Sequence, residues 1–188
     1  MKVNGNTIKP GNVIEHKNGL WVATKTSHVK PGKGGAFAQI ELRNLKDGSK
    51  LNERFRSSEN VEKVILVETP HVFLYQENNN LIFMNNQTFE QITVNIDMIG
   101  GQAAFLQDGM NVIINLYNEN PVSIIMPDNC VEEIIEADAV IKGQTVSSSF
   151  KPAILKNGIK VMVPGHIEVG SKIVVRPSDG TYVEKAKT

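Results

Sequence analysis

Cysteine is almost absent from this 188-residue chain, and its scarcity limits how the fold can be stabilised. The single thiol, Cys130, allows no disulfide within the chain, and we expect it to be buried and unreactive in a reducing cytosol. No apolar run approaches the roughly 18 residues of a membrane-spanning helix, and the first residues lack the apolar segment of a signal peptide. The sequence therefore predicts a cytoplasmic protein that does not associate with membranes.

Residue patterns for catalysis and metal binding are also missing. The four histidines are scattered without the spacing of metal ligands: His16, His28, His71 and His166. Glu132 and Glu133 are adjacent in a predicted strand, so their side chains point to opposite faces and cannot act as a pair. The segment 31–35, PGKGG, resembles a phosphate-binding loop but has Gly34 where Ser or Thr would hold magnesium. We therefore predict no catalytic residue, no metal site and no cofactor.

Positive charge is missing from the middle of the chain, although the net charge of the whole chain is zero. Residues 1–63 contain 12 lysines and arginines against 6 acidic residues. Residues 64–127 contain none against 6, and residues 128–188 contain 8 against 8. Such a distribution favours separate modules, the first with an anion-binding surface.

Turn signals and short apolar segments indicate an all-β fold. Four residue pairs that favour tight hairpin turns lie between β-rich segments: Asn18-Gly19, Asp47-Gly48, Asn157-Gly158 and Asp179-Gly180. Only residues 95–107 have a helical pattern, and the glycine pair at 100–101 limits any helix there to a short one. Many short strands joined by such turns are typical of small barrels or sandwiches.

The basic first segment is where we expect binding. Six cations lie on or beside its predicted hairpins: Lys25, Lys30, Lys33, Arg43, Arg54 and Arg56. Each alone is compatible with an ordinary solvated face, but together they favour contact with nucleic-acid phosphates. Lys33 lies in a loop whose other residues are small or rigid, so its side chain would extend well beyond its neighbours. These neighbours are Pro31, Gly32, Gly34 and Gly35. Trp21, the only tryptophan, is expected in the core rather than as a base-stacking platform.

Three motifs in order along the chain resemble those of bacterial elongation factor P. The first is Pro31-Gly32-Lys33-Gly34 followed by Phe37, and the second is the hairpin segment 73–92, FLYQENNNLIFMNNQTFEQI. The third is a spaced signature near the end of the chain: Lys151, Ala153, Gly158, Val161, Val163, Pro164, Ile167 and Gly170. The likeness runs essentially from end to end.

The resemblance implies three small β-barrel domains in an elongated, L-shaped, tRNA-like arrangement. These would be an SH3-like (KOW-like) domain at 1–63, an OB-type domain at 64–127 and a second OB-type domain at 128–188. Domains of about 60 residues are near the lower limit for an independent core, so two of them should share an interface. We expect the first and second to pack together, the third to be more loosely hinged, and the protein to be a monomer.

The resemblance also implies a task. Such a translation elongation factor binds the 70S ribosome between the P and E sites and promotes peptide-bond formation on stalled, consecutive-proline sequences. Lys33 would position the P-site peptidyl-tRNA beside rRNA, after extension by a modifying enzyme that resembles a lysyl-tRNA synthetase. Gly143, Gln144 and Thr145 match a family loop that approaches the E-site codon, with Gln144 replacing the family aspartate.

Two other hypotheses about the function remain open at this point. The first is a generic RNA-binding protein with KOW-like and OB-like parts and no modified tip lysine. The second is an enzyme with an unrecognised site, which the missing catalytic patterns disfavour.

Overall fold

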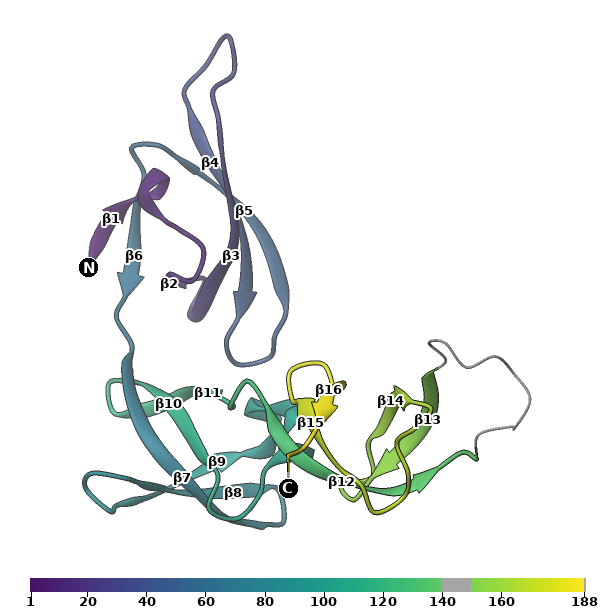
Figure 1. The fold of residues 1–188 in the computed structure, drawn as a ribbon. Helices are drawn as coiled ribbons and strands as arrows, with labels where there is room; N and C mark the ends of the chain where they lie inside the picture. The colour runs from purple at the N-terminus through teal and green to yellow at the C-terminus, as the bar shows by residue number, and fades with distance from the viewer. Residues whose placement is uncertain (140–149, 188) are drawn as a thin grey trace.

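The computed structural model describes residues 1–139 and 150–187, which fold into three antiparallel β-sheets (Figure 1). Strands of the first sheet, here the N-terminal domain, pair in the order β1-β6-β2-β3-β4-β5. Its elements are β1 (Lys2–Asn4), the 3-10 helix η1 (Gly5–Thr7), β2 (Val13–His16), β3 (Gly19–Val29), β4 (Phe37–Asn44), β5 (Lys50–Arg56) and β6 (Asn60–Val64).

The second sheet, the central domain, has the strand order β11-β10-β7-β8-β9. Its elements are β7 (Val67–Glu77), β8 (Asn80–Asn85), β9 (Gln91–Asn95), η2 (Ile96–Met98), η3 (Gly100–Phe105), β10 (Asn111–Tyr117) and β11 (Asn120–Ile125). The helical pattern predicted at 95–107 is confirmed as two short 3-10 helices, which end against the core through buried Phe105.

The third sheet, the C-terminal domain, has the strand order β14-β13-β12-β15-β16. Its strands are β12 (Cys130–Ala137), β13 (Phe150–Leu155), β14 (Lys160–Pro164), β15 (Lys172–Arg176) and β16 (Thr181–Lys185). Cys130 is buried, as predicted. The three residues matched to the codon-side loop, Gly143, Gln144 and Thr145, lie outside the described residues.

The predicted turns form hairpins, with one shift of position. At the β2–β3 turn, Lys17 and Asn18 carry the positive φ angles, 45° and 58°, so the turn lies one residue before the predicted Asn18-Gly19 pair. Gly19 instead allows a close approach, because an added Cβ would lie 3.1 Å from Nε1 of Trp21. Trp21 is buried in the N-terminal core, as predicted.

The apolar core is divided differently from the prediction. Buried residues of the central and C-terminal domains form one continuous cluster, which runs from Phe73 through Phe105 and Met126 to Ile134 and Val175. The N-terminal domain has its own core, so the expectation that the first and second domains pack together is wrong. The two domains are joined at residues 105–107: Nε2 of Gln107 donates to the carbonyl oxygen of Val131 at 2.8 Å, and the Phe105 ring lies beside Gly180.

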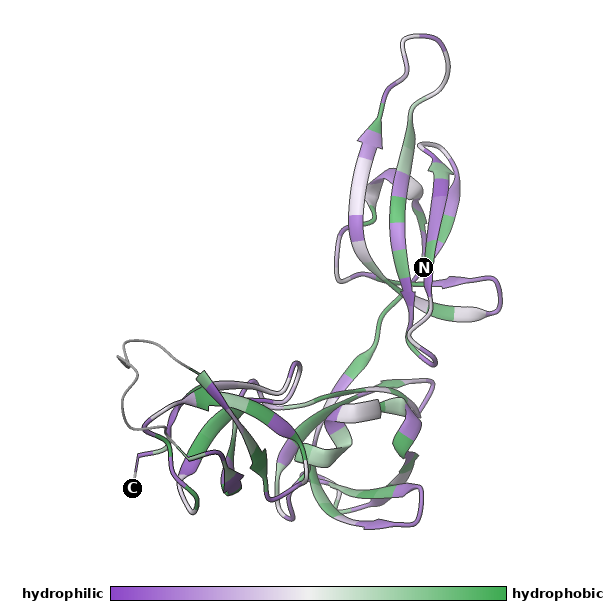
Figure 2. Cartoon of the chain, turned by 90° about the vertical axis from the view of Figure 1, so that its right-hand side faces the viewer, coloured by the Kyte–Doolittle hydropathy of each residue, from purple (hydrophilic) through white to green (hydrophobic). Residues whose placement is uncertain are grey.

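The three domains form an L. The N-terminal domain projects from the fused central and C-terminal pair (Figure 1), and the view turned by 90° shows the same arrangement (Figure 2). The two parts adjoin where residues 44–46 and Met98 line one pocket. Between the two parts the chain is extended, and Ile65 and Val67 are largely exposed. The all-β prediction with three β-domains is confirmed, and the boundaries at 63 and 127 stay a prediction. Within the described residues, no helix has the length and apolarity needed to cross a membrane.

Candidate nucleic-acid interface

The hairpin of β3 and β4 carries Lys33 beyond the end of its sheet. The two strands pair from Trp21 opposite Asn44 to Val29 opposite Phe37. Residues 30–36 connect them, and in Figure 1 this loop is the part of the N-terminal domain farthest from the central domain. A long strand pair therefore acts as a support that holds the lysine loop away from the rest of the molecule.

Four interactions hold the base of this loop. The carbonyl oxygen of Ala36 accepts hydrogen bonds from the backbone N–H of Ser57 at 3.1 Å and from its hydroxyl at 2.9 Å. Nε2 of His28 donates to the carbonyl oxygen of Asn6 at 2.8 Å, which ties β3 to η1. The guanidinium of Arg54 lies 5.0 Å from the centre of the Phe37 ring, a cation–π arrangement.

The tip itself is free in this structure. Residues 30–35 are exposed, and within the described part of the chain Lys33 makes no hydrogen bond or ion pair. Gly34 has φ +128°, a conformation that other residues rarely adopt. A Cβ added to Gly32 or Gly35 would meet no atom within 4 Å. The fold therefore requires glycine at position 34 but leaves room for side chains on either side of it.

Strand alternation places four of the predicted cations on one face of the sheet. On β4, Ala38, Ile40 and Leu42 are buried, so the residues between them point outward. The cations take the outward positions across the ladder: Lys25 opposite Glu41, Arg43 opposite Lys50, Arg54 opposite Gln39 and Arg56 opposite Phe37. We call these four residues the basic face. All four are exposed, and none forms an ion pair with another described residue.

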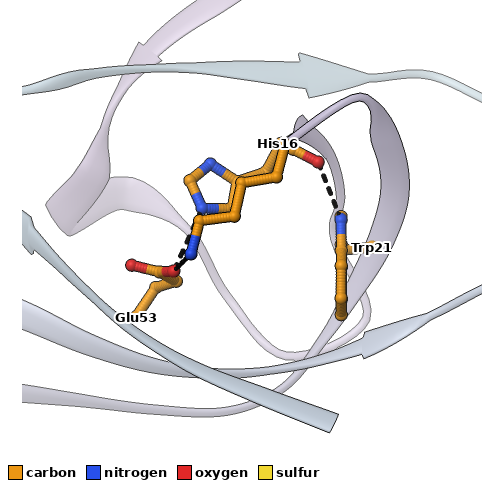
Figure 3. Close-up of polar contacts among 4 residues, drawn as sticks. His16, Trp21 and Glu53 are labelled. Carbon is orange, nitrogen blue, oxygen red and sulfur yellow. Dashed lines mark hydrogen bonds and ion pairs between the residues drawn. The ribbon is translucent and has the colours of Figure 1, made fainter. Parts of the chain in front are cut away.

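Glu53 of β5 is kept apart from the basic face. Its carboxylate forms an ion pair with Lys17 and lies 3.4 Å from Nε2 of His16, while the His16 carbonyl accepts the Trp21 Nε1–H at 2.8 Å (Figure 3). The hydrogen bond from Lys17, together with the nearby His16 ring, lowers the pKa of Glu53 below its ordinary value. Because Glu53 is satisfied by Lys17 on its own side of the strand, it does not neutralise Arg54.

The arrangement brings together most of the residues that the sequence singled out, and adds others. Lys30 and Lys33 extend past the hairpin end, in line with the strands that carry the basic face. Sequence reasoning did not find the supporting roles of Asn6, His28 and Ser57. No local pattern marks them, because His28 and Asn6 are 22 residues apart in the chain, and Ser57 and Ala36 are 21 apart. Chemically, such a surface can bind phosphates and project one amine.

Three family models match successive parts of the chain. They are described as the elongation factor P KOW-like domain at residues 4–61, the elongation factor P OB domain at 66–124, and the elongation factor P C-terminal domain at 131–185. The expected KOW-like and OB-type domains are thereby confirmed for the first two parts.

Curated relatives agree over the whole length. Proteins named "Elongation factor P" from Chelativorans sp. and Brucella canis are each 54% identical over 186 residues, which cover 99% of this chain and 100% of theirs. A protein of the same name from Bartonella henselae is also 54% identical, over 97% of its length.

Solved structures show the fold at lower identity. One titled "Eukaryotic translation initiation factor 5A from Methanococcus jannaschii" aligns with a TM-score of 0.54 at 23% identity, covering 66% of this chain and 94% of that one. A translation initiation factor of the same type from Naegleria fowleri aligns with a TM-score of 0.50 at 17% identity, over 67% and 98% of the two chains.

Proposed function

The chain belongs to the elongation factor P family, and from this premise we propose that it works on the ribosome as a translation elongation factor that positions P-site peptidyl-tRNA with Lys33. The observation that carries the proposal is the free lysine on a hairpin whose base is held and whose outer face is basic. In this proposal the basic face contacts tRNA and rRNA phosphates, and the loop reaches toward the end of the tRNA that carries the nascent chain.

Proline explains why such a factor is needed. The ring fixes φ and makes the proline nitrogen a secondary amine, so consecutive prolines give poor attack geometry and a slow nucleophile. The ribosome catalyses peptide-bond formation largely by orientation, and a misplacement of about 1 Å can cost about a hundredfold in rate. A lysine that holds the peptidyl-tRNA end restores that orientation, while the chemistry stays with the ribosome and the tRNA.

The remaining parts of the proposal follow the family. The factor binds the 70S ribosome between the P and E sites, where its L shape occupies the space of a tRNA. An enzyme resembling a lysyl-tRNA synthetase extends Lys33, which lengthens its reach and adds hydrogen-bonding groups. The exposure of Lys33 leaves the amine accessible to such an enzyme. The codon-side role of residues 143–145 and the cytoplasmic location remain predictions.

A generic RNA-binding protein is the alternative. It would need the basic face but not the loop, because phosphate contacts do not require a lysine projected on glycines. The glycines at 32 and 35, which the free protein has no steric need for, therefore favour the positioning function.

Substitution of Lys33 tests the proposal. Lys33→Ala should change the free energy of unfolding by less than about 0.5 kcal/mol, because the side chain is exposed. It should weaken ribosome binding only modestly and abolish the effect on a reporter with consecutive prolines, while a proline-free reporter is translated normally. Lys33→Arg keeps the charge but blocks lysine-specific modification, so it should fail nearly as badly.

The outcomes separate the two functions. Full activity of the alanine variant on the proline reporter would refute positioning by Lys33 and favour the generic RNA-binding protein. Full activity of the arginine variant alone would leave positioning in place and show that charge without modification is enough.

A further inference from the structure

The turn between β8 and β9 holds an aromatic residue where glycine is the usual choice. The backbone N–H of Phe89 donates to the carbonyl oxygen of Asn85 at 2.9 Å, and Phe89 has φ +61°. The backbone N–H of Asn85 also donates to the carbonyl oxygen of Glu90 at 2.9 Å, which closes the hairpin. A left-handed position in a hairpin loop is one that glycine normally occupies. A bulky side chain is unfavourable in that conformation, so the turn stores backbone strain at Phe89.

Burial does not compensate for this strain. Phe89 is 70% exposed, and it belongs to neither apolar core. The turn around it is nevertheless well held, because Oδ1 of Asn85 accepts from the backbone of Gln87 at 2.8 Å and of Thr88 at 3.1 Å. The backbone of Asn86 also donates to the carbonyl oxygen of Pro70 at 3.0 Å. A fixed turn thus presents a phenyl ring to solvent at a cost to stability, which points to a use outside the fold.

The charge of the central domain indicates which kind of partner the Phe89 ring would contact. Residues 64–127 contain no lysine or arginine and six acidic residues, and one of these, Glu90, directly follows Phe89. Such a surface repels phosphates, so it is unsuited to stacking on a nucleic-acid base. A protein surface rich in lysine and arginine is attracted to it, and cations and their aliphatic stems also pack well on an aromatic face.

We propose that residues 86–90 of the β8–β9 turn dock on a lysine- and arginine-rich protein of the ribosome, with Phe89 as the anchoring side chain. The inference rests on the proposed function for its target, the ribosome, but uses a different domain from the lysine hairpin. The basic face then contacts RNA while the acidic central domain contacts protein. Each charged surface of the molecule thereby has a partner of opposite sign.

Three variants separate a docking role from a structural one. Phe89→Gly relieves the backbone strain and removes the ring, so it should keep or raise the melting temperature and weaken the Kd for 70S ribosomes by about tenfold. Phe89→Tyr keeps an aromatic ring and should bind within about twofold of the unmodified chain. Asn78→Gly is the matched control, because exposed Asn78 also has a positive φ, 53°, in the neighbouring β7–β8 turn. It should leave binding unchanged.

A photoreactive benzoylphenylalanine at position 89 identifies the contact. Crosslinking to a ribosomal protein supports the inference, and crosslinking to rRNA or to nothing overturns it, as does tight binding by Phe89→Gly. A fall of several degrees in the melting temperature of Phe89→Gly would likewise overturn it, since the ring would then stabilise the fold. If the unmodified chain itself fails to bind ribosomes, the proposed function fails with it, and this outcome is distinguishable from a failure at Phe89 alone.

Discussion

The glycines of the lysine loop differ in why they are needed. One is required by the fold, and two are required only by the proposed function. Gly34 adopts a backbone conformation that only glycine takes easily, whereas Gly32 and Gly35 are surrounded by open space. In the positioning proposal these two glycines keep the loop narrow where it passes along RNA. Their role is then visible only in the bound state.

Gly32→Ala and Gly35→Ala should therefore leave the melting temperature within about 1 °C of the parent, since exposed substitutions without clashes cost little. Both should reduce activity on the consecutive-proline reporter. Ser58→Ala, at an exposed position outside the loop, is the control and should change neither quantity. If the two glycine variants are fully active, the loop does not pass through a narrow channel.

Glu132 is a buried carboxylate at the junction of two domains. It is 7% exposed, and its Oε1 accepts from Nε2 of Gln107 at 3.0 Å and from Nδ2 of Asn157 at 3.4 Å. Burial raises the pKa of Glu132 above its ordinary value of 4.5, more than the Gln107 hydrogen bond lowers it. The stability that its protonation provides is fully present below pH 4.5 and is lost as the pH rises through the raised pKa.

Glu132→Gln should consequently melt at a higher temperature than the parent at pH 7.5, because the amide oxygen keeps both acceptor roles without a buried charge. The difference should shrink as the pH falls toward 4. Thermal melts across this range measure it, with Glu133→Gln as the more exposed neighbour whose effect should not follow the same curve. A constant difference at every pH would contradict the buried-charge explanation.

At the scale of elements, β5 is the strand that most directly joins the basic face to the loop. Arg54 and Arg56 occupy successive outward positions on it, and Arg54 also covers the Phe37 ring. The strand thus supports the hairpin base and carries charge toward the proposed RNA surface. Both tasks depend on the register that pairs Arg56 with Phe37.

Neutralising both arginines, Arg54→Gln and Arg56→Gln, should flatten the dependence of log affinity on log salt for ribosome binding. Two lost phosphate contacts correspond to a slope change of about 1.4 to 1.8. The double variant Lys172→Gln and Lys185→Gln removes the same charge from the C-terminal domain and is the control. An unchanged slope in the arginine variant would show that this face is merely solvated.

At the scale of the whole molecule, the three domains should unfold as two cooperative units. The central and C-terminal domains share a core, and Gln107 donates from the one to the Val131 carbonyl of the other at 2.8 Å. Phe105 also reaches the C-terminal domain, since a Cβ added to Gly180 would lie 3.8 Å from its ring. The N-terminal domain has a separate core and an extended connection.

Calorimetry should accordingly resolve two transitions rather than one or three. Phe105→Ala should destabilise the shared unit by about 3 to 5 kcal/mol and leave the N-terminal transition in place. Phe55→Ala, in the N-terminal core, should do the reverse. Separate melting of the central and C-terminal domains would show that their shared core does not couple them.

Much of the architecture could be predicted because its causes are local. At three of the four predicted pairs the hairpin turn is set by a glycine with positive φ, at Gly48, Gly158 and Gly180. The alternation of buried and exposed residues follows from the two-residue period of side chains along a strand. The burial of Trp21 was predicted from its apolar neighbours and that of Cys130 from its being the only cysteine, and the structure confirms both. The loop around Lys33 was also recognisable, because its motif lies within seven consecutive residues. The roles assigned to Lys33 and the basic face remain predictions.

Other features were decided only by the tertiary structure, because they depend on contacts between residues far apart in the chain. The sequence by itself determined a basic first segment, an acidic second one and a projecting lysine. It did not determine which two domains share a core, and the predicted pair was wrong. Only the sheet register placed Arg54 over Phe37 and Ser57 under Ala36, and only the backbone angle at Phe89 revealed a strained, exposed ring. Local preferences specify strands and turns, but the free energy of burying one apolar face against another selects how they pack.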